Sequence, residues 1–362
     1  MKKILVLLVS LFALSGCSTV PEPVLAESSG HSVTLKLSPD GFVYHDDLNE
    51  LSKLLFEEAR LTEIEFDDIT AVDISASFDN IVITTGGDKL MVRYFGWLEN
   101  QYALHADNGN LTISQGDIPY HRITGTRTSH GLFSGTMISG VGYNRAWYFN
   151  YLESRGKEPR VTVEIIIPQS LALDSLQAYV SSGNVSFSNA QLNGNVTAGA
   201  SSGTISAYDS VFNHYVDLSV SSGTVSIYNS VFNRYADLSA SSGAVSAVNS
   251  VFNDNTGFNV SSGTVSAQNN GFAGTVSVGA SSGRVIIEDC AFNNLSVYTS
   301  SGSGHIRLDA SADNYDIYFS TVRGGLSYNG ESIDRDGLRN SGAASRIELS
   351  SSTGSFEITD TN

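Results

Sequence analysis

The chain has 362 residues, a formal net charge of −17 at pH 7, 34 glycines, six prolines and two cysteines. The acidic balance argues against a nucleic-acid partner, and two cysteines are too few for a disulfide framework. Only 16% of the residues are charged, and many glycines accompany few prolines, a composition that is typical of strands and turns and unlike that of a disordered chain.

The first sixteen residues have the features of a secretory signal. Lys2 and Lys3 precede an apolar stretch, residues 4–14, which is too short to cross a bilayer as a helix. The run Leu-Ser-Gly-Cys that ends at Cys17 resembles the lipobox of bacterial lipoproteins. The resemblance implies cleavage before Cys17 and attachment of lipid to it, which would anchor the mature protein to a membrane. An ordinary secretory signal with an incidental cysteine is the alternative.

Two short segments follow the signal. Residues 17–40 combine prolines, serines and glycine without periodicity, and we expect a flexible tether. We expect residues 41–62 to hold a helix over residues 46–61 that caps the open end of the main fold, because apolar residues recur on one helical face. A partner-binding or membrane-surface helix is the alternative, although the polar face is acidic. The apolar face consists of Leu48, Leu51, Leu55 and Ala59.

From residue 71 the apolar residues alternate with polar ones, which predicts half-buried strands separated by turns. The pattern covers residues 71–84, 90–94, 111–113 and 161–168, where Pro168 ends the run. Residues 117–160 interrupt it and form an irregular insert.

Seven Ser-Ser-Gly triplets then divide residues 181–302 into near-identical units, with five steps of 20 residues and a last step of 19. A fixed period of this length predicts stacked coils. Counted from the first serine, positions 5 and 7 and positions 16, 18 and 20 are apolar or small, which predicts two short strands and two turns in each coil. The sequence therefore predicts an all-β, single-stack parallel β-solenoid, or β-helix, over residues 63–362, with residues 303–362 as closing coils and cap.

Three columns of residues recur through the coils. Phenylalanine at position 12 is expected to fill the interior as a stack. The glycine of each triplet is expected at positive φ, where a Cβ would be strained. Asn or Asp at position 9 and Asn at position 13 are expected to form hydrogen-bonded ladders. The phenylalanines are Phe212, Phe232, Phe252, Phe272 and Phe292, and the glycines are Gly183, Gly203, Gly223, Gly243, Gly263, Gly283 and Gly302.

Several stretches of the chain resemble one bacterial family. They are AVDISASFDNIVIT at residues 71–84, NGNLTIS at 108–114, VTVEIIIP at 161–168, the triplet repeats, YDIYFS at 315–320 and RIELSSSTGSFEIT at 346–359. These stretches resemble the family of bacterial "putative adhesins" that is built on a β-solenoid domain of unknown function and includes many lipoproteins. The resemblance implies a parallel β-solenoid and a location in the cell envelope, and it implies little about activity.

The insert is basic and aromatic in an otherwise acidic chain. Arginine, glycine and exposed aromatic rings suit stacking on sugars or contact with an anionic envelope polymer. A structural flap that packs its rings on the solenoid is the alternative. The candidate ligand-binding residues are Arg122, Arg127, Arg145, Trp147, Tyr148 and Tyr151.

We predict a non-enzymatic, lipid-anchored envelope protein, an adhesin or interaction scaffold at the outer membrane or cell surface. We expect a glycan or an envelope protein as its partner and no cofactor, metal or nucleic acid. We expect no catalysis by the repeated serines, because they have no base at a matching offset. One alternative is a carbohydrate-active β-helix enzyme, a polysaccharide lyase or hydrolase, with Asp217 and Asp237 at position 17 of neighbouring coils as the catalytic candidates. A second alternative is an envelope-stress accessory protein.

Overall fold

A computed structural model describes residues 24–28, 31–37, 43–45, 60–77, 79–96, 102–115, 121–123, 162–333, 338–339 and 342–360. The chain divides into two compact units, one of residues 1–58 and 119–148 and the other of residues 59–118 and 149–362. Apart from one 3-10 turn, η1 (Ala312–Asn314), every element in these ranges is a strand, which confirms the predicted all-β fold. No helix in these ranges is long and apolar enough to span a membrane.

The smaller unit contains a four-stranded sheet in the order β1-β2-β3-β10. Strands β1 (Val24–Ser28) and β2 (His31–Leu37) form an antiparallel hairpin, β3 (Val43–His45) pairs antiparallel with β2, and β10 (His121–Ile123) pairs parallel with β3. Strands β1 and β2 lie within residues 17–40, where we expected a flexible tether. In β2 the apolar residues alternate over a few positions only, too short a run to stand out beside the prolines and serines before it.

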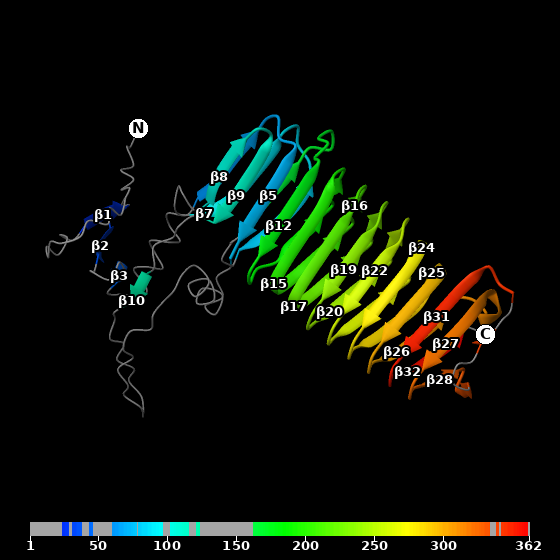
Figure 1. Ribbon diagram of the computed structural model, residues 1–362. Helices are drawn as coiled ribbons and strands as arrows, with labels where there is room; N and C mark the ends of the chain where they lie inside the picture. Colours follow the sequence, from blue (N-terminus) through cyan, green and yellow to red (C-terminus); the bar gives the residue numbers. More distant parts are fainter. Residues whose placement is uncertain are drawn as a thin grey trace, which may run out of the picture. The chain divides into compact units, whose positions relative to one another are not determined.

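In the larger unit, parallel strands stack coil upon coil into a solenoid (Figure 1). Each strand pairs with the strand 20 residues later, as in Val196↔Val216 and Val216↔Ala236, and the last repeat step is Val276↔Leu295. The fold is thus parallel and solenoid-like, as predicted. Its strands are β12 (Ser175–Val180), β13 (Val185–Ser188), β14 (Gln191–Leu192), β15 (Asn195–Tyr208), β16 (Val211–Phe212), β17 (Val216–Tyr228), β18 (Val231–Phe232), β19 (Ala236–Ala240), β20 (Ala244–Val248), β21 (Val251–Phe252), β22 (Thr256–Val260), β23 (Thr264–Gln268), β24 (Gly271–Ala280), β25 (Arg284–Thr299) and β26 (Ser303–Leu308).

Each regular coil has three strand segments, where two were predicted. The third is a two-residue strand that ends with the position-12 side chain, as in β16, β18 and β21. This short strand directs the phenylalanine column inward. The ring centroids of Phe212 and Phe232, and of Phe232 and Phe252, lie 4.8 Å apart with nearly parallel planes, and Phe272 continues the stack at 5.0 Å.

Two positions shape the corners of each coil: position 9 adopts a left-handed backbone conformation, and position 13 forms hydrogen bonds between coils. The Asn or Asp at position 9 has φ between 49° and 54° in all six copies, the left-handed conformation that these two residue types tolerate best. At position 13 the expected amide ladder is present: Asn213 Nδ2 donates to Asn193 Oδ1 at 2.7 Å, and Asn233 Nδ2 donates to Asn213 Oδ1 at 2.6 Å. Asn253 extends the ladder at 2.7 Å.

A second ladder, at position 10, was not anticipated from the sequence. Ser210, Ser230 and Ser250 are buried, and the hydroxyls of Ser210 and Ser230 accept from the backbone N–H of the preceding coil at 3.1 and 3.2 Å. The same hydroxyls donate to the carbonyl two residues earlier, at 2.8 Å for Ser210 and 2.9 Å for Ser230. Each buried hydroxyl therefore links two coils.

The triplet glycines do not have the positive φ that we expected. None of the seven is among the residues of positive φ, so that explanation is wrong. Their backbones instead approach one another along the stack: a Cβ added to Gly223 would overlap the carbonyl oxygen of Gly203, and one added to Gly243 would overlap that of Gly223. Glycine is required at this corner by contact between coils.

Stacking order departs from chain order at both ends of the solenoid. At one end, β5 (Ala71–Ala76) and β6 (Asn80–Thr85) pair with β12 and β13, while β9 (Asn110–Gln115) and β11 (Thr162–Ile167) lie outside them. The insert therefore interrupts the outermost coil between β9 and β11, at the corner where other coils have Ser-Ser-Gly.

At the other end, the last strands in sequence lie inside the stack. Strands β31 (Ser345–Ser351) and β32 (Ser355–Asp360) pair with β25 and β26 on one side. On their other side lie β27 (Tyr315–Thr321) and β28 (Gly325–Tyr328), which come earlier in the chain.

Short antiparallel strands close both ends. Strand β7 (Leu90–Gly96) pairs with β11, β4 (Arg60–Phe66) pairs with β7, and β8 (Tyr102–Asp107) pairs with β9. At the other end, β29 (Glu331–Ile333) pairs with β28, and β30 (Leu338–Arg339) pairs with β27. The exposed carboxylates of Glu63 and Glu65 on β4 discourage further strand pairing.

The helix predicted over residues 46–61 is wrong at its C-terminal end. Residues 43–45 form β3, and residues 60–62 belong to β4; residues 46–59 lie outside the described residues. In β4 the side chains alternate between exposed and half-buried, as in Glu63 and Ile64, which is a strand pattern that pairing with β7 imposes.

Candidate functional site

The residues proposed from the insert cannot be placed as a site. Arg122 lies in β10, where the structure describes the backbone but not the side chain. The other five, Arg127, Arg145, Trp147, Tyr148 and Tyr151, and the lipidation candidate Cys17 also lie outside them.

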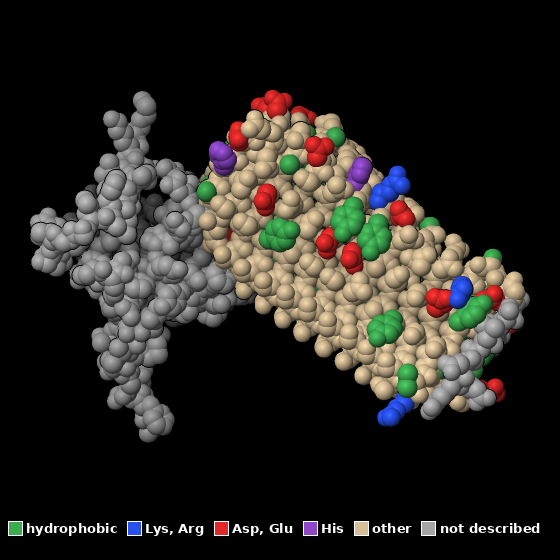
Figure 2. Space-filling view, viewed as in Figure 1, with side chains coloured by type: hydrophobic (Ala, Val, Ile, Leu, Met, Phe, Trp, Pro, Cys, Tyr) green, Lys and Arg blue, Asp and Glu red, His purple; other side chains and the backbone are tan. Residues whose placement is uncertain are grey.

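The structure brings together a second group of candidates on the outward face of β17 and β19. Asp217 and Asp237 are in-register partners, so that their carboxylates project from neighbouring coils. Tyr215 and Tyr235 precede them and stack on each other, with ring centroids 5.8 Å apart and planes 11° apart. These four residues form the tyrosine–aspartate patch. Figure 2 shows hydrophobic and acidic side chains that lie close together on a surface otherwise made mostly of backbone and uncharged polar side chains.

Burial and neighbouring carboxylates raise the pKa values of three residues in the patch. Partial burial, followed by the charge of Asp237, raises the pKa of Asp217. Burial and the two carboxylates also raise the pKa values of Tyr215 and Tyr235. The Asp237 carboxylate accepts a hydrogen bond from Asn259 Nδ2 at 3.2 Å, whereas no hydrogen-bond donor or cation is found against Asp217 among the described residues.

A glycine keeps the patch open on its next coil. A Cβ added to Gly257 would lie 3.1 Å from Asp237 Oδ1 and 3.4 Å from the Tyr235 hydroxyl oxygen. Any larger residue would crowd both groups. The sequence shows that Asp217 and Asp237 share one position in neighbouring coils. It does not show that the two tyrosines and Gly257 lie against them, because that follows only from the register of the coils.

Two chemistries are open to this arrangement. In-register strands lie about 4.8 Å apart, close to the separation of about 5 Å that retaining glycosidases use between their two carboxyl groups. Exposed tyrosine rings and carboxylates also bind the faces and hydroxyls of sugars without reaction. Both side-chain types sit on an open sheet face, and the two tyrosines are 41% and 39% exposed.

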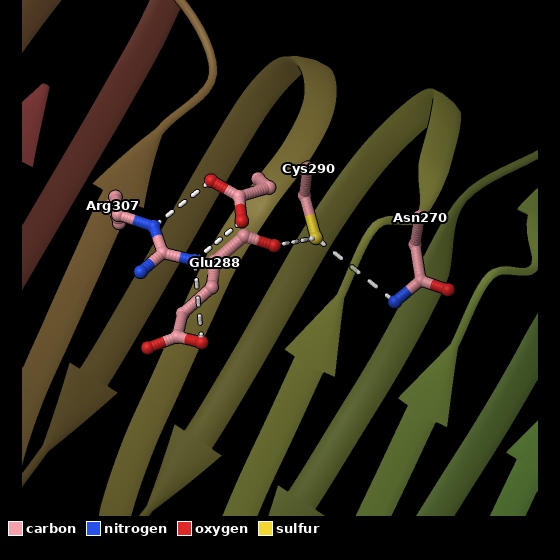
Figure 3. A network of polar contacts seen from close by, with 5 residues as sticks. Asn270, Glu288, Cys290 and Arg307 are labelled. Carbon is pink, nitrogen blue, oxygen red and sulfur yellow. Dashed lines mark hydrogen bonds and ion pairs between the residues drawn. The ribbon is translucent and has the colours of Figure 1, made fainter. Parts of the chain in front are cut away.

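Cys290 belongs to the fold. It takes the position of Ser210, Ser230 and Ser250 at the end of the buried ladder, where its Sγ contacts the Glu288 carbonyl oxygen at 3.3 Å and Asn270 Nδ2 at 4.0 Å (Figure 3). Burial raises the pKa of the thiol to about 11, so it is protonated and a poor nucleophile at neutral pH.

The charged neighbours of Cys290 face the surface. Arg307 donates through Nε to Asp289 Oδ1 at 2.9 Å, and its Nη2 pairs with Asp289 and, at 3.6 Å, with Glu288 (Figure 3). The guanidinium holds the pKa of Asp289 below its ordinary value. Within the part of the chain that the structure describes, no three His, Cys, Asp or Glu side chains gather to hold a metal ion.

Two family models match the sequence. One, described as Toastrack DUF4097, matches residues 69–359, and the other, described as a prokaryotic membrane lipoprotein lipid attachment site, matches residues 1–18. No curated protein matches the chain.

Several solved structures are similar to the chain at low identity. A "putative adhesin" from Parabacteroides distasonis is 9% identical with a TM-score of 0.48, covering 84% of this chain and 97% of that chain. A "putative lipid binding protein" from the same species is 13% identical with a TM-score of 0.45, covering 85% and 98%. A "putative adhesin" from Parabacteroides merdae is 9% identical with a TM-score of 0.44, covering 85% and 98%.

Proposed function

The chain belongs to the Toastrack DUF4097 family, and on that premise we propose that it is a lipid-anchored envelope protein that acts by binding, as an adhesin or interaction scaffold, without catalysis. The match of residues 1–18 to a lipid attachment site supports the anchor at Cys17. We place the protein at the outer membrane or the cell surface.

The proposed organisation follows from the anchor. Residues 1–16 are the signal that is removed, and the segment after Cys17 connects the lipid to a solenoid body of residues 63–362. That body consists of the 20-residue coils of residues 181–302, the closing coils of residues 303–362 and the insert of residues 117–160. A glycan or an envelope protein is the partner.

The observation that carries the proposal is the solenoid's outer face. In-register coils repeat the same outward side chains at a fixed spacing, as the stacked Tyr215 and Tyr235 show. A polymer or surface with its own repeat can meet such a face at several equivalent points, which strengthens weak contacts. The basic and aromatic insert is a second contact region in this proposal.

The anchor can be tested by metabolic labelling of the full chain with a palmitate analogue in a bacterial host. We expect Cys17→Ser to lose the label and to leave the membrane fraction. Cys290→Ser is the matched control and should keep both, because Cys290 is a buried residue of the fold. Label that persists in the Cys17→Ser protein would contradict the anchor.

The binding role can be tested by deleting residues 121–160 and measuring the binding of the protein to cells, glycans and envelope fractions. Loss of binding would assign recognition to the insert, and unchanged binding would assign it to the solenoid. Absence of binding by the intact protein in all three assays would contradict the proposed function.

The carbohydrate-active enzyme is the second candidate, and one observation favours it. Asp217 has a raised pKa beside Asp237, the kind of pairing that separates a general acid from a base. Turnover of a polysaccharide that disappears in Asp217→Asn, and not in the control Asp254→Asn, would establish this candidate in place of the binding role.

A further inference from the structure

A groove runs along the stacking direction beside the tyrosine–aspartate patch. It consists of two cavities of about 600 and 360 Å³ that share Ser239 and Ser241 in their walls and so run into each other. We call it the serine groove. Its floor is position 19 of successive coils, and its wall is the first serine of each triplet, from Ser181 to Ser281.

Two exposed tyrosines bound the middle of the groove floor, and beyond Tyr179 the larger cavity continues along Ser75 and Ser114. A glycine lies next to each tyrosine, and hydroxyl and amide side chains lie between the glycines. The residues in stacking order are Tyr179, Gly199, Ser219, Ser239, Asn259, Gly279 and Tyr298.

The two tyrosines present their rings to solvent within the groove, with 41% of Tyr179 and 51% of Tyr298 exposed. A Cβ added to Gly199 would lie 2.8 Å from Cδ1 of Tyr179, so that ring lies over the glycine. Gly279 is the strand partner of Tyr298, and the Tyr298 hydroxyl lies 3.2 Å from Ser300 Oγ. Glycine at position 199 therefore leaves room for the Tyr179 ring.

The chemistry of the lining selects an uncharged ligand. The residues that line the two cavities offer hydroxyls, amides, backbone groups and aromatic rings, and none of them is charged, in a protein of net charge −17. Sugars combine hydroxyls that pair with such groups and C–H faces that stack on aromatic rings. A charged polymer would gain no ion pair here.

The distance between the two tyrosines suits a chain of several sugars. Six coil steps separate Tyr179 from Tyr298, or about 29 Å at the usual strand spacing of about 4.8 Å. The length of one pyranose unit in an extended glycan is close to one coil step. A chain of about six sugars would therefore reach both rings.

We propose that the serine groove binds an extended, uncharged glycan chain along the stacking direction, with sugar rings on Tyr179 and Tyr298. This inference rests on the proposed binding function and names its ligand class and site.

The test uses the full lipidated chain in detergent micelles and isothermal titration with two probes, cellohexaose and the hexamer of N-acetylglucosamine. We expect at least one hexamer to bind, and its disaccharide to bind at least tenfold more weakly. Tyr179→Ala and Tyr298→Ala should each weaken hexamer binding about tenfold, since each removes one aromatic ring on which a sugar stacks. Melting temperatures near that of the unmodified chain show that these surface variants fold.

Two matched controls define the site. Tyr208→Ala removes a tyrosine of equal exposure, 42%, that does not line the groove, and it should leave binding unchanged. Ser239→Tyr blocks the junction of the two cavities and should abolish hexamer binding, whereas Ser246→Tyr, at an outward position of β20, should not.

The inference is overturned if neither hexamer binds, or if Tyr208→Ala lowers affinity as much as Tyr179→Ala. Binding to cells or envelope fractions that persists without hexamer binding would remove the groove and leave the proposed function intact. Loss of both kinds of binding would remove the function as well.

Discussion

At the scale of single residues, the triplet glycine shows why residue type and residue role must be separated. Glycine at a coil corner predicted a positive φ, but the positive φ lies at position 9, on Asn and Asp, at the next corner of the coil. The triplet glycine is needed because the carbonyl of the preceding coil occupies the place of a Cβ. A single chain sequence cannot distinguish these two requirements, because both select glycine.

This distinction predicts unequal effects of two glycine substitutions. Gly243→Ala should destabilise the solenoid by at least about 2 kcal/mol, since the added Cβ overlaps backbone that parallel pairing holds in place. Gly271→Ala should be tolerated, because an added Cβ there meets nothing within 4 Å. Denaturant unfolding of both variants measures the difference, and equal stability would contradict the close-approach explanation.

Cys290 gives a pH prediction at the same scale. Its pKa is raised from an ordinary 9.0 to about 11 by burial, so the folded state favours the neutral thiol. The associated stability is fully present below pH 9 and is lost as the pH rises toward 11. In the lipidated chain, alkylation of this thiol by iodoacetamide should be negligible at pH 8 until denaturant is added. Rapid alkylation of the folded protein at pH 8 would contradict its burial.

At the scale of elements, period and alternation were enough to predict the parallel coils and most strands. The strands at residues 71–85, 90–96 and 162–167 follow directly from alternation. The two-residue strand that ends at position 12 was not predictable, because two residues are too few to show an alternating pattern. The buried serine ladder was missed because serine at position 10 reads as a turn residue, and only the coil register shows its two partners.

Two aspartates on the coils should respond oppositely to substitution by asparagine. Asp217 has a raised pKa, so its stabilising contribution is present below its unfolded pKa and lost as the pH rises through its folded pKa. Asp289 has a lowered pKa through Arg307, so its contribution is present above the unfolded pKa and lost on acidification. At pH 7, Asp217→Asn should raise the melting temperature and Asp289→Asn should lower it.

Asp289→Asn is a clean comparison because position 9 holds asparagine in four other coils, with the same positive φ. Both melting temperatures should approach that of the unmodified chain at acidic pH, where the carboxyl groups are protonated. A fall in melting temperature for Asp217→Asn at pH 7 would contradict the burial and the charge repulsion that raise the pKa of Asp217.

At the scale of the larger unit, the stacking order at the ends of the solenoid could not be predicted from the sequence. The repeat predicts that coil follows coil in chain order, yet β31 and β32 lie between β25–β26 and β27–β28. Nothing in the period marks this exchange, since the end coils lack the triplets. Antiparallel strands also pair at both ends, which the repeat does not predict.

Hydrogen exchange tests this order. Backbone amides of β31 and β32 should exchange more slowly than those of β29 and β30, because the former have parallel partners on both sides. In chain order the last strands would form the exposed end. Faster hydrogen exchange in β31 and β32 than in β29 would therefore contradict the placement of β31 and β32 inside the stack.

The central claim is that the protein binds while anchored to a membrane by its lipid and does not cleave what it binds. The most direct measurement is the amount and length of an uncharged polysaccharide retained by bacterial membrane vesicles that carry the full chain. We predict that these vesicles retain polymer of unchanged length and that vesicles from the Cys17→Ser strain retain none. Vesicles that retain no polymer, or that shorten it through Asp217, would contradict the claim.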